Sequence, residues 1–517
     1  MEREVLAQTA GGNLRGALSG GVFSFKGVPY GADTGGALRF QPPRPISWVG
    51  VRDAIAPGPR SPQNEAATQA PYITWLRDPT SAGEACLALN VFTASMSQSE
   101  RRPVMVYLHG GAFVVGSGGA PGVDGGNLAR RGVVVVTVNH RLNLFGHLYL
   151  GDADAGRYAD AGNAGMLDLV AALEWVRDNI AGFGGDPGNV TIFGQSGGGS
   201  KVGALMAMPC ARGLFHKAII QSASSVLALA TLEEAERNTD HFLAQLGLDR
   251  TRLRALCEMP AETLLRAMPA AIRAAGGVDN FRPVVDGRTL FSQPFDAAAV
   301  RLSADIPLMT GWCENEQRLT FASMPQVYRR SFTEALASTA LALGVTPDEA
   351  EPLMQVYRAG RPQDAPGDVY AQIFGDHRYR RTVTAVAQAR LTHGGAPPYV
   401  YLLDWKSPAH EGLLRTPHTL CLAFAFANTQ LASGITGDGT ERLVPQEQMA
   451  DAWVAFARSG NPNHAGLPAW QAYALQDRPT MVFGREPRLQ ADPLRAERLA
   501  LERYPRYLPA IGEGRLR

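Results

Sequence analysis

The sequence predicts an α/β fold in which helices cover both faces of a mostly parallel sheet. Short β-branched runs alternate along the chain with segments that have helical spacing. Residues 104–108 and 133–138 are continuous apolar runs, which is typical of strands buried on both faces. Residues 165–180 carry apolar side chains on one helical stripe. With 517 residues and 45% hydrophobic content, the chain can bury a large core.

The remaining elements follow from the same patterns. Each predicted strand is a short run rich in β-branched or aromatic residues, and each helix has apolar residues three or four positions apart. We expect strands at residues 23–28, 104–108, 133–138, 190–193, 218–220, 306–310, 399–405 and 480–483, and helices at 165–180, 201–208 and 448–459.

The middle of the chain has a different composition. Residues 232–268 and 331–359 are rich in Ala, Leu, Glu and Arg at helical spacing. Ligands of open α/β sheets bind at the carboxyl ends of the strands. We therefore expect one elaborated domain over residues 1–517, with helical insertions at about 225–300 and 322–392 that form lid or regulatory regions over the site.

Composition excludes several classes of function. The chain has 49 basic and 48 acidic residues and a net charge of +1, with no basic cluster interleaved with aromatics, so we expect no nucleic-acid partner. The start of the chain is charged, and no apolar run could span a bilayer. The five cysteines have no metal-type spacing. We expect free thiols, no metal, a cytoplasmic location and, by preference, a monomer.

A Gly-x-Ser-x-Gly pentapeptide centres on Ser196. It follows the predicted strand 190–193 and precedes a segment that can continue as a helix. The tight turn leaves room for almost no side chain two residues before and after the serine, where Gly194 and Gly198 stand. Such a turn holds the serine backbone in a strained conformation, with the hydroxyl facing a cleft. The segment therefore predicts acyl transfer through a serine ester.

A glycine loop after strand 104–108 predicts an oxyanion hole. Residues 109–113 read His-Gly-Gly-Ala-Phe, and glycines let backbone N–H groups turn toward one point. We expect the amides of Gly111, Ala112 and Gly197 to stabilise the oxyanion of a tetrahedral intermediate.

The acid and base have several candidates. Glu314 and Glu316 both follow strand 306–310, and the strand end alone does not separate them. In α/β enzymes whose serine occupies such a turn, the order is nucleophile, acid, histidine. The pattern favours His418 over His410, which lies in a segment typical of an exposed turn. The histidines that satisfy the order are His377, His393, His410, His418 and His464.

Motifs along nearly the whole chain carry a family resemblance. Residues 25–30 read Phe-Lys-Gly-Val-Pro-Tyr, residues 84–91 read Glu-Ala-Cys-Leu-Ala-Leu-Asn-Val, and residues 183–187 read Phe-Gly-Gly-Asp-Pro before the serine turn. Gly-Asn-Pro-Asn follows at 460–463. The chain resembles the type-B carboxylesterases, which include para-nitrobenzyl esterases, animal carboxylesterases and cholinesterases. The resemblance implies an α/β-hydrolase fold, a Ser-His-Glu triad and no cofactor.

The resemblance also implies roles for single residues. The family's acid lies five residues after the glycine that ends its strand, which matches Glu316. Its histidine precedes an apolar and aromatic segment, which matches His418. Ser222 matches a serine that hydrogen-bonds to the triad. Gln195 and His109 are expected beside the nucleophile and the oxyanion loop.

The chain departs from the family at several positions near the site. Gln195 stands where relatives usually have Glu, and Gly197 where they usually have Ala. Gln317 replaces a Gly, and Cys421 replaces an acidic residue. The family's first disulfide pairs the cysteine that matches Cys86 with one that corresponds to a serine here, so that bridge is not expected.

These residues predict a serine carboxylesterase that cleaves uncharged hydrophobic esters with water and no cofactor. The same triad also suits a carbamate or an aryl amide, and a non-catalytic binding relative is the remote alternative. Aromatic residues near the motifs are candidates to line the pocket, with core packing as their alternative role. They are Tyr72, Trp75, Phe113, Trp312 and Phe321.

Overall fold

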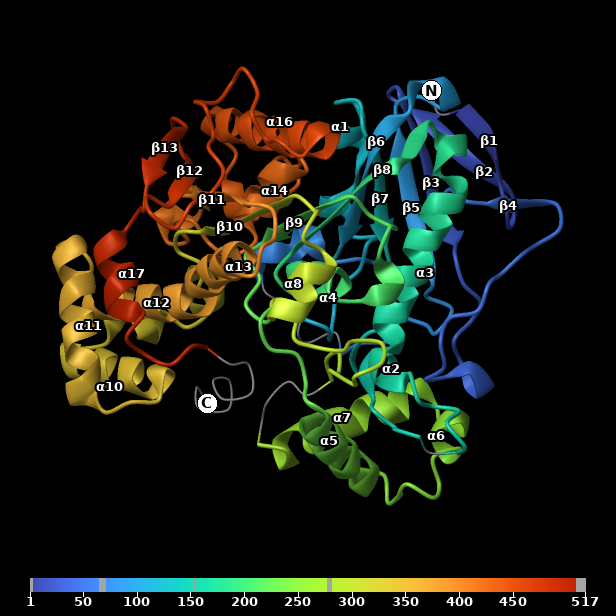
Figure 1. The fold of residues 1–517 in the computed structure, drawn as a ribbon, viewed down its shortest axis with the longest axis horizontal. Coiled ribbons are helices and arrows are strands. Elements are labelled where there is room, and N and C mark those ends of the chain that lie inside the picture. Colours follow the sequence, from blue (N-terminus) through green and yellow to red (C-terminus); the bar gives the residue numbers. More distant parts are fainter. Residues whose placement is uncertain (1–2, 65–70, 153, 277–280, 508–517) are drawn as a thin grey trace.

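The computed structural model of the protein describes residues 3–64, 71–152, 154–276 and 281–507. A single large sheet runs through it, in the order β1-β2-β3-β5-β7-β6-β8-β9-β10-β11-β12-β13, with β4 beside β2 (Figure 1). The strands are β1 Arg3–Thr9, β2 Gly12–Ser19, β3 Val22–Pro29, β4 Val51–Asp53, β5 Ala88–Thr93, β6 Arg102–Leu108, β7 Val134–Val138, β8 Gly185–Gln195, β9 Lys217–Gln221, β10 Leu308–Cys313, β11 Tyr399–Leu403, β12 Pro479–Phe483 and β13 Arg488–Ala491.

The centre of the sheet is parallel, as predicted. From β7 through β6, β8, β9, β10 and β11 to β12, every neighbouring pair is parallel. Antiparallel strands flank this block on both sides. Consequently the carboxyl ends of β6, β8 and β10 meet at one edge, where the loops that follow them lie side by side.

Helices cover both faces of the sheet. Alternate residues of β6 point to opposite cores: Val104 and Val106 pack in the core that contains α3 and α4, whereas Met105 and Tyr107 pack in the core that contains α14 and α16. The helices are α1 Gly126–Ala129, α2 Asn143–His147, α3 Ala164–Asn179, α4 Gly197–Met206, α5 Leu232–Gln245, α6 Ala255–Glu258, α7 Ala261–Ala274, α8 Ala297–Leu302, α9 Arg318–Phe321, α10 Phe332–Leu343, α11 Pro347–Gly360, α12 Pro366–Gly375, α13 Arg381–Thr392, α14 Leu420–Ala425, α15 Ser433–Thr436, α16 Leu443–Ser459 and α17 Arg495–Leu501.

Two groups of helices interrupt the strand order where the composition changes. Helices α5 to α8 lie between β9 and β10, and α9 to α13 lie between β10 and β11. In Figure 1, α5 to α7 form one group at an end of the molecule, and α10 to α12 form another with α17. Capping boxes at Ser331 and Thr346 begin α10 and α11. That these groups act as lids remains a prediction.

No helix in the described ranges is both long and apolar enough to cross a membrane.

Candidate active site

Ser196 lies on a strained turn between β8 and α4. Its φ of 58° and ψ of −125° are unusual for a residue with a side chain. The flanking glycines are required sterically: a Cβ on Gly194 would lie 2.4 Å from the carbonyl carbon of Gly198, and one on Gly198 would lie 2.0 Å from the Leu108 oxygen. Ser196 is the only residue between positions 191 and 200 that is partly exposed, and the others are buried. The turn thus presents this one side chain to the cavity.

The structure brings Glu316 and His418 together although they are far apart in sequence. His418 Nδ1 donates to Glu316 Oε2 at 2.5 Å, and the His418 amide donates to the Glu316 carbonyl at 3.1 Å. The other carboxylate oxygen accepts from the Cys313 amide at 2.8 Å, and the Glu316 side chain is 2% exposed. The carboxylate is therefore fixed at the end of β10 and holds the imidazole in one orientation.

The alternative carboxylate and the four other candidate histidines lie outside the cavity that contains Ser196. The Glu314 carboxylate forms an ion pair with Lys406, whose side chain is half exposed. His410 Nε2 bonds to the Gly434 carbonyl at 3.0 Å, and its ring packs edge-on against Tyr72. Neither lines the cavity that contains Ser196. The geometry thus separates residues that the strand pattern left together.

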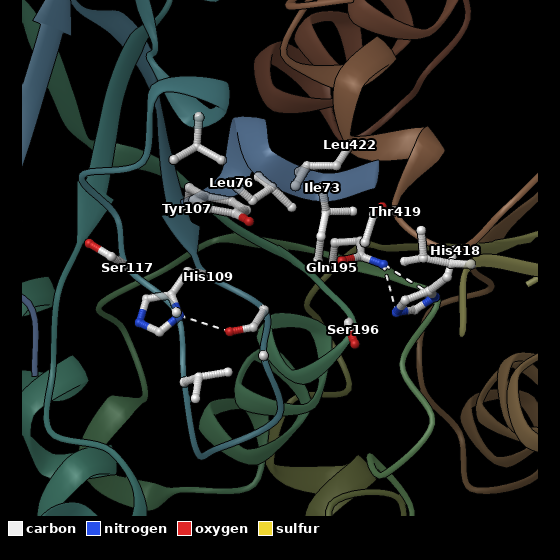
Figure 2. Close-up of a pocket in the computed structure, with 16 residues that line it drawn as sticks. Ile73, Leu76, Tyr107, His109, Ser117, Gln195, Ser196, His418, Thr419 and Leu422 are labelled. Carbon is white, nitrogen blue, oxygen red and sulfur yellow. Dashed lines mark hydrogen bonds between the residues drawn. The ribbon is translucent and has the colours of Figure 1, made fainter. Parts of the chain in front are cut away.

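Gln195 contacts the imidazole directly. Its Nε2 lies 3.1 Å from His418 Nε2 and 3.4 Å from Nδ1 (Figure 2). Because the amide nitrogen is nearly equidistant from the two ring nitrogens, it lies against the imidazole ring and not along the in-plane lone pair of Nε2. Nδ1 donates to Glu316, so Nε2 keeps its lone pair. Within the described residues, Ser196 has no hydrogen bond to His418.

The predicted oxyanion loop lies against the start of α4. A Cβ on Gly197 would lie 2.2 Å from the Ala112 oxygen and 2.4 Å from its Cα, so only glycine fits there. Gly111 and Ala112 have positive φ values of 86° and 54°. Over the ranges that the structure describes, the backbone N–H groups of Gly111, Ala112 and Gly197 have no acceptor. They are available as donors.

Ser222 and His109, two further predicted neighbours of the site, are both buried. Ser222 is buried, and its amide donates to the Gly311 carbonyl at 2.8 Å, which continues the pairing of β9 with β10. Its hydroxyl has no partner among the described residues, so the expected bond to the triad is not formed. His109 lines the cavity, with Nδ1 2.9 Å from the Gly110 oxygen. Burial, and then the Lys201 charge, lower its pKa well below the ordinary value.

One apolar cavity of about 180 Å³ contains the site (Figure 2). Ser196, His418 and Gln195 open into it together with Gly111. None of its lining residues is Asp, Glu, Lys or Arg. Its aliphatic walls are Ile73, Leu76, Val115, Val123, Leu319 and Leu422.

The five predicted pocket aromatics do not line this cavity, and the prediction is corrected accordingly. Trp75 and Phe113 are buried in the two cores that flank the sheet, and Trp312 is buried with Val383 and Leu402. Their rings complete core packing instead. Phe321 stacks on Tyr370 and Phe374, and Tyr72 packs against His410.

Sequence reasoning missed Ile73 and Leu76, each of which directly follows one of the proposed aromatics. It also missed Lys201 on α4, which is fully buried beneath the glycine loop. A lysine in an otherwise small and apolar stretch after the serine was the available signal.

The chain is similar to known proteins over nearly its whole length. The Carboxylesterase family profile matches residues 3–501. The para-nitrobenzyl esterase of Bacillus subtilis (strain 168) is 35% identical over 98% of this chain and 99% of its own length. The phenmedipham hydrolase of Pseudarthrobacter oxydans is 33% identical over 93% of this chain and 95% of its own length.

Solved structures give the same result. A carboxylesterase from Geobacillus stearothermophilus aligns with a TM-score of 0.83 at 36% identity, covering 96% of this chain and 99% of that chain. A PNB esterase structure aligns with a TM-score of 0.81 at 33% identity over the same shares. This chain therefore belongs to the carboxylesterase family, has the α/β-hydrolase fold and is a carboxylic ester hydrolase.

Proposed function

We propose that the protein cleaves uncharged, hydrophobic carboxylic esters through an acyl-enzyme formed on Ser196. The observation that carries this proposal is the meeting of a strained serine with the His418–Glu316 pair in one cavity. A serine hydroxyl is a poor nucleophile at neutral pH unless a base within reach takes its proton.

The first half-reaction forms the acyl-enzyme. His418 Nε2 takes the proton of the Ser196 hydroxyl as Oγ attacks the ester carbonyl. The amides of Gly111, Ala112 and Gly197 stabilise the resulting oxyanion. The imidazolium, held by Glu316, then protonates the leaving alcohol as the C–O bond breaks.

The second half-reaction releases the acid. Water enters, His418 takes its proton, and the hydroxide adds to the acyl carbonyl. Collapse of the second tetrahedral intermediate breaks the bond to Ser196 Oγ, which recovers its proton from His418. The free carboxylic acid leaves, and no cofactor is consumed.

The cavity supports the substrate class. Its lining is mostly apolar and includes no Asp, Glu, Lys or Arg, so an ionised acyl group would lose hydration without gaining an ion-pair partner. An uncharged apolar acyl chain has no such hydration to lose, and its transfer from water into the cavity is favourable.

Replacing Ser196 by Ala tests the proposal. Ser196→Ala should abolish the burst of nitrophenol from a nitrophenyl ester, whereas Ser200→Ala, which removes another buried hydroxyl from the same helix, should retain it. Persistence of the burst in the folded Ser196→Ala variant would show that another residue is the nucleophile.

A further inference from the structure

A single buried ammonium joins the two ends of the glycine loop. Lys201, on α4, is 0% exposed, and its Nζ donates to the carbonyl oxygens of His109 and Ala112, each at 2.9 Å. The ammonium also lies 5.5 Å from the centroid of the Phe113 ring. Among the described residues it has no carboxylate partner.

Such a residue is costly to bury. A lysine without a counter-ion loses hydration that carbonyl oxygens replace only in part. Burial lowers the pKa of Lys201 to about 7. The imidazoles of His109, His140 and His147 lie within its field, and burial together with this charge depresses their pKa values as well. The neutral amine keeps two N–H groups, so both protonation states can hold two carbonyls.

The contacts of Lys201 complete a pattern in the loop. The carbonyl of Gly110 lies 2.9 Å from His109 Nδ1, and that of Gly111 accepts from the amides of Val114 and Val115. With the two oxygens bound to Lys201, all four carbonyls of residues 109–112 have partners. In a trans peptide the C=O and N–H point in opposite directions. The carbonyls of Gly110 and Gly111 therefore set the directions of the N–H groups of Gly111 and Ala112, and Lys201 fixes the peptide planes on either side of these two.

We propose that Lys201 is a positioning residue that clamps the glycine loop in its donor geometry beside Ser196. This inference rests on the proposed function of Ser196. The clamp opposes the strain of Ala112, which has a positive φ, and holds the Ala112 carbonyl against Gly197. When protonated, Lys201 also adds a positive charge behind the developing oxyanion.

The clamp acts on the transition state more than on the bound substrate. The loop amides bind most strongly to an oxygen that carries full negative charge, which exists only in the tetrahedral intermediate. Loosening the loop should therefore lower kcat and leave KM nearly constant. An inhibitor that forms an oxyanion on the serine should bind more weakly, by the same factor by which kcat falls.

The test compares Lys201→Met with Lys217→Met. Lys217 is also a mostly buried lysine, but its Nζ bonds to Asn189 at the opposite end of the sheet. Lys201→Met should lower kcat about 10- to 100-fold with KM within about twofold. It should raise the Ki of a trifluoromethyl ketone, which forms a tetrahedral oxyanion on the serine, by the same factor. The Ki of the matching alcohol, which forms no adduct, should stay constant, and Lys217→Met should leave kcat unchanged.

A second variant keeps the test possible if the first one does not fold. If Lys201→Met does not accumulate as folded protein, Lys201→Gln, whose amide still carries N–H donors, should give a kcat between those of the wild type and Ser196→Ala. An unchanged kcat in either folded variant, or a ketone Ki that does not follow kcat, would overturn the clamp. If Ser196→Ala also kept its burst, the proposed function would fail as well. If Ser196→Ala lost it, only the clamp would fail.

Discussion

The Gln195 amide nitrogen lies 3.1 Å from Nε2 of His418 and 3.4 Å from Nδ1, against the imidazole ring. A neutral amide there adds no net charge beside the imidazole. A carboxylate at this position would instead stabilise the imidazolium, since an opposite charge within about 4 Å raises a histidine pKa.

Gln195→Glu should therefore place a negative charge that stabilises the imidazolium of His418. The acid limb of kcat/KM should move to higher pH, by about one unit, because the base must be neutral to take the serine proton. A pH–rate profile measures this shift. Gln195→Leu, which removes the amide without adding charge, should not move the limb upward. An acid limb that stays in place in Gln195→Glu would contradict the contact.

Glu316→Gln should lower kcat by about 10³-fold, because an amide neither stabilises the imidazolium nor enforces the correct tautomer. Glu314→Gln is the matched control, since that carboxylate pairs with Lys406 away from the cavity. Steady-state kinetics on a nitrophenyl ester measure both. Similar losses in the two variants would mean that the wrong carboxylate has been assigned.

Gly197→Ala should lower kcat about 10- to 100-fold, because the new Cβ would meet the Ala112 oxygen at 2.2 Å and push the donor loop away from Ser196. Gly199→Ala, on the same helix, meets its nearest atom at 3.0 Å and should be tolerated better. If Gly197→Ala kept full activity with normal thermal stability, the close packing of Gly197 on Ala112 would not matter for the reaction.

The buried imidazoles should make stability fall in acid. Burial lowers the pKa of His147 to about 3 and that of His140 well below its ordinary value. Below about pH 6.5 the unfolded chain binds protons that the folded protein does not, so the free energy of unfolding falls as pH falls, by about 1.4 kcal/mol per unit for each such proton. For His147 this loss extends from about pH 6.5 down to about pH 3.

Urea unfolding at neutral pH and at about pH 5 measures this slope. His147→Gln should reduce the slope by the contribution of one proton. Equal slopes in the wild type and His147→Gln would contradict the buried, neutral state of His147.

The sheet was predictable because its strands are marked locally. A run such as residues 133–138 satisfies strand propensity and burial on both faces at once, and β7 occupies Val134–Val138. The serine turn was equally clear, since its glycines are required by contacts within the same few residues. The exact bounds of β8, which begins at Gly185 rather than near 190, depend on its pairing with β6.

The walls of the cavity were less predictable. Whether Trp312 faces the site or the core depends on which elements pack over β10, and a single sequence does not encode that in any local pattern. In the sequence, Lys201 is one residue of a helical segment with no local mark of a special contact. Its hydrogen bonds form only because α4 packs beneath the loop that follows β6. The orientation of the Gln195 amide likewise depends on the position of His418, which is distant in the sequence.

The central claim is that Ser196 carries the acyl group. Rapid acid quench of the enzyme with a slowly turned-over nitrophenyl ester, followed by digestion and mass spectrometry, tests it directly. We predict one acyl group per chain, found on the peptide that contains Ser196 and absent from Ser196→Ala. An acyl group on a different residue, or turnover with no covalent intermediate at any quench time, would contradict the account.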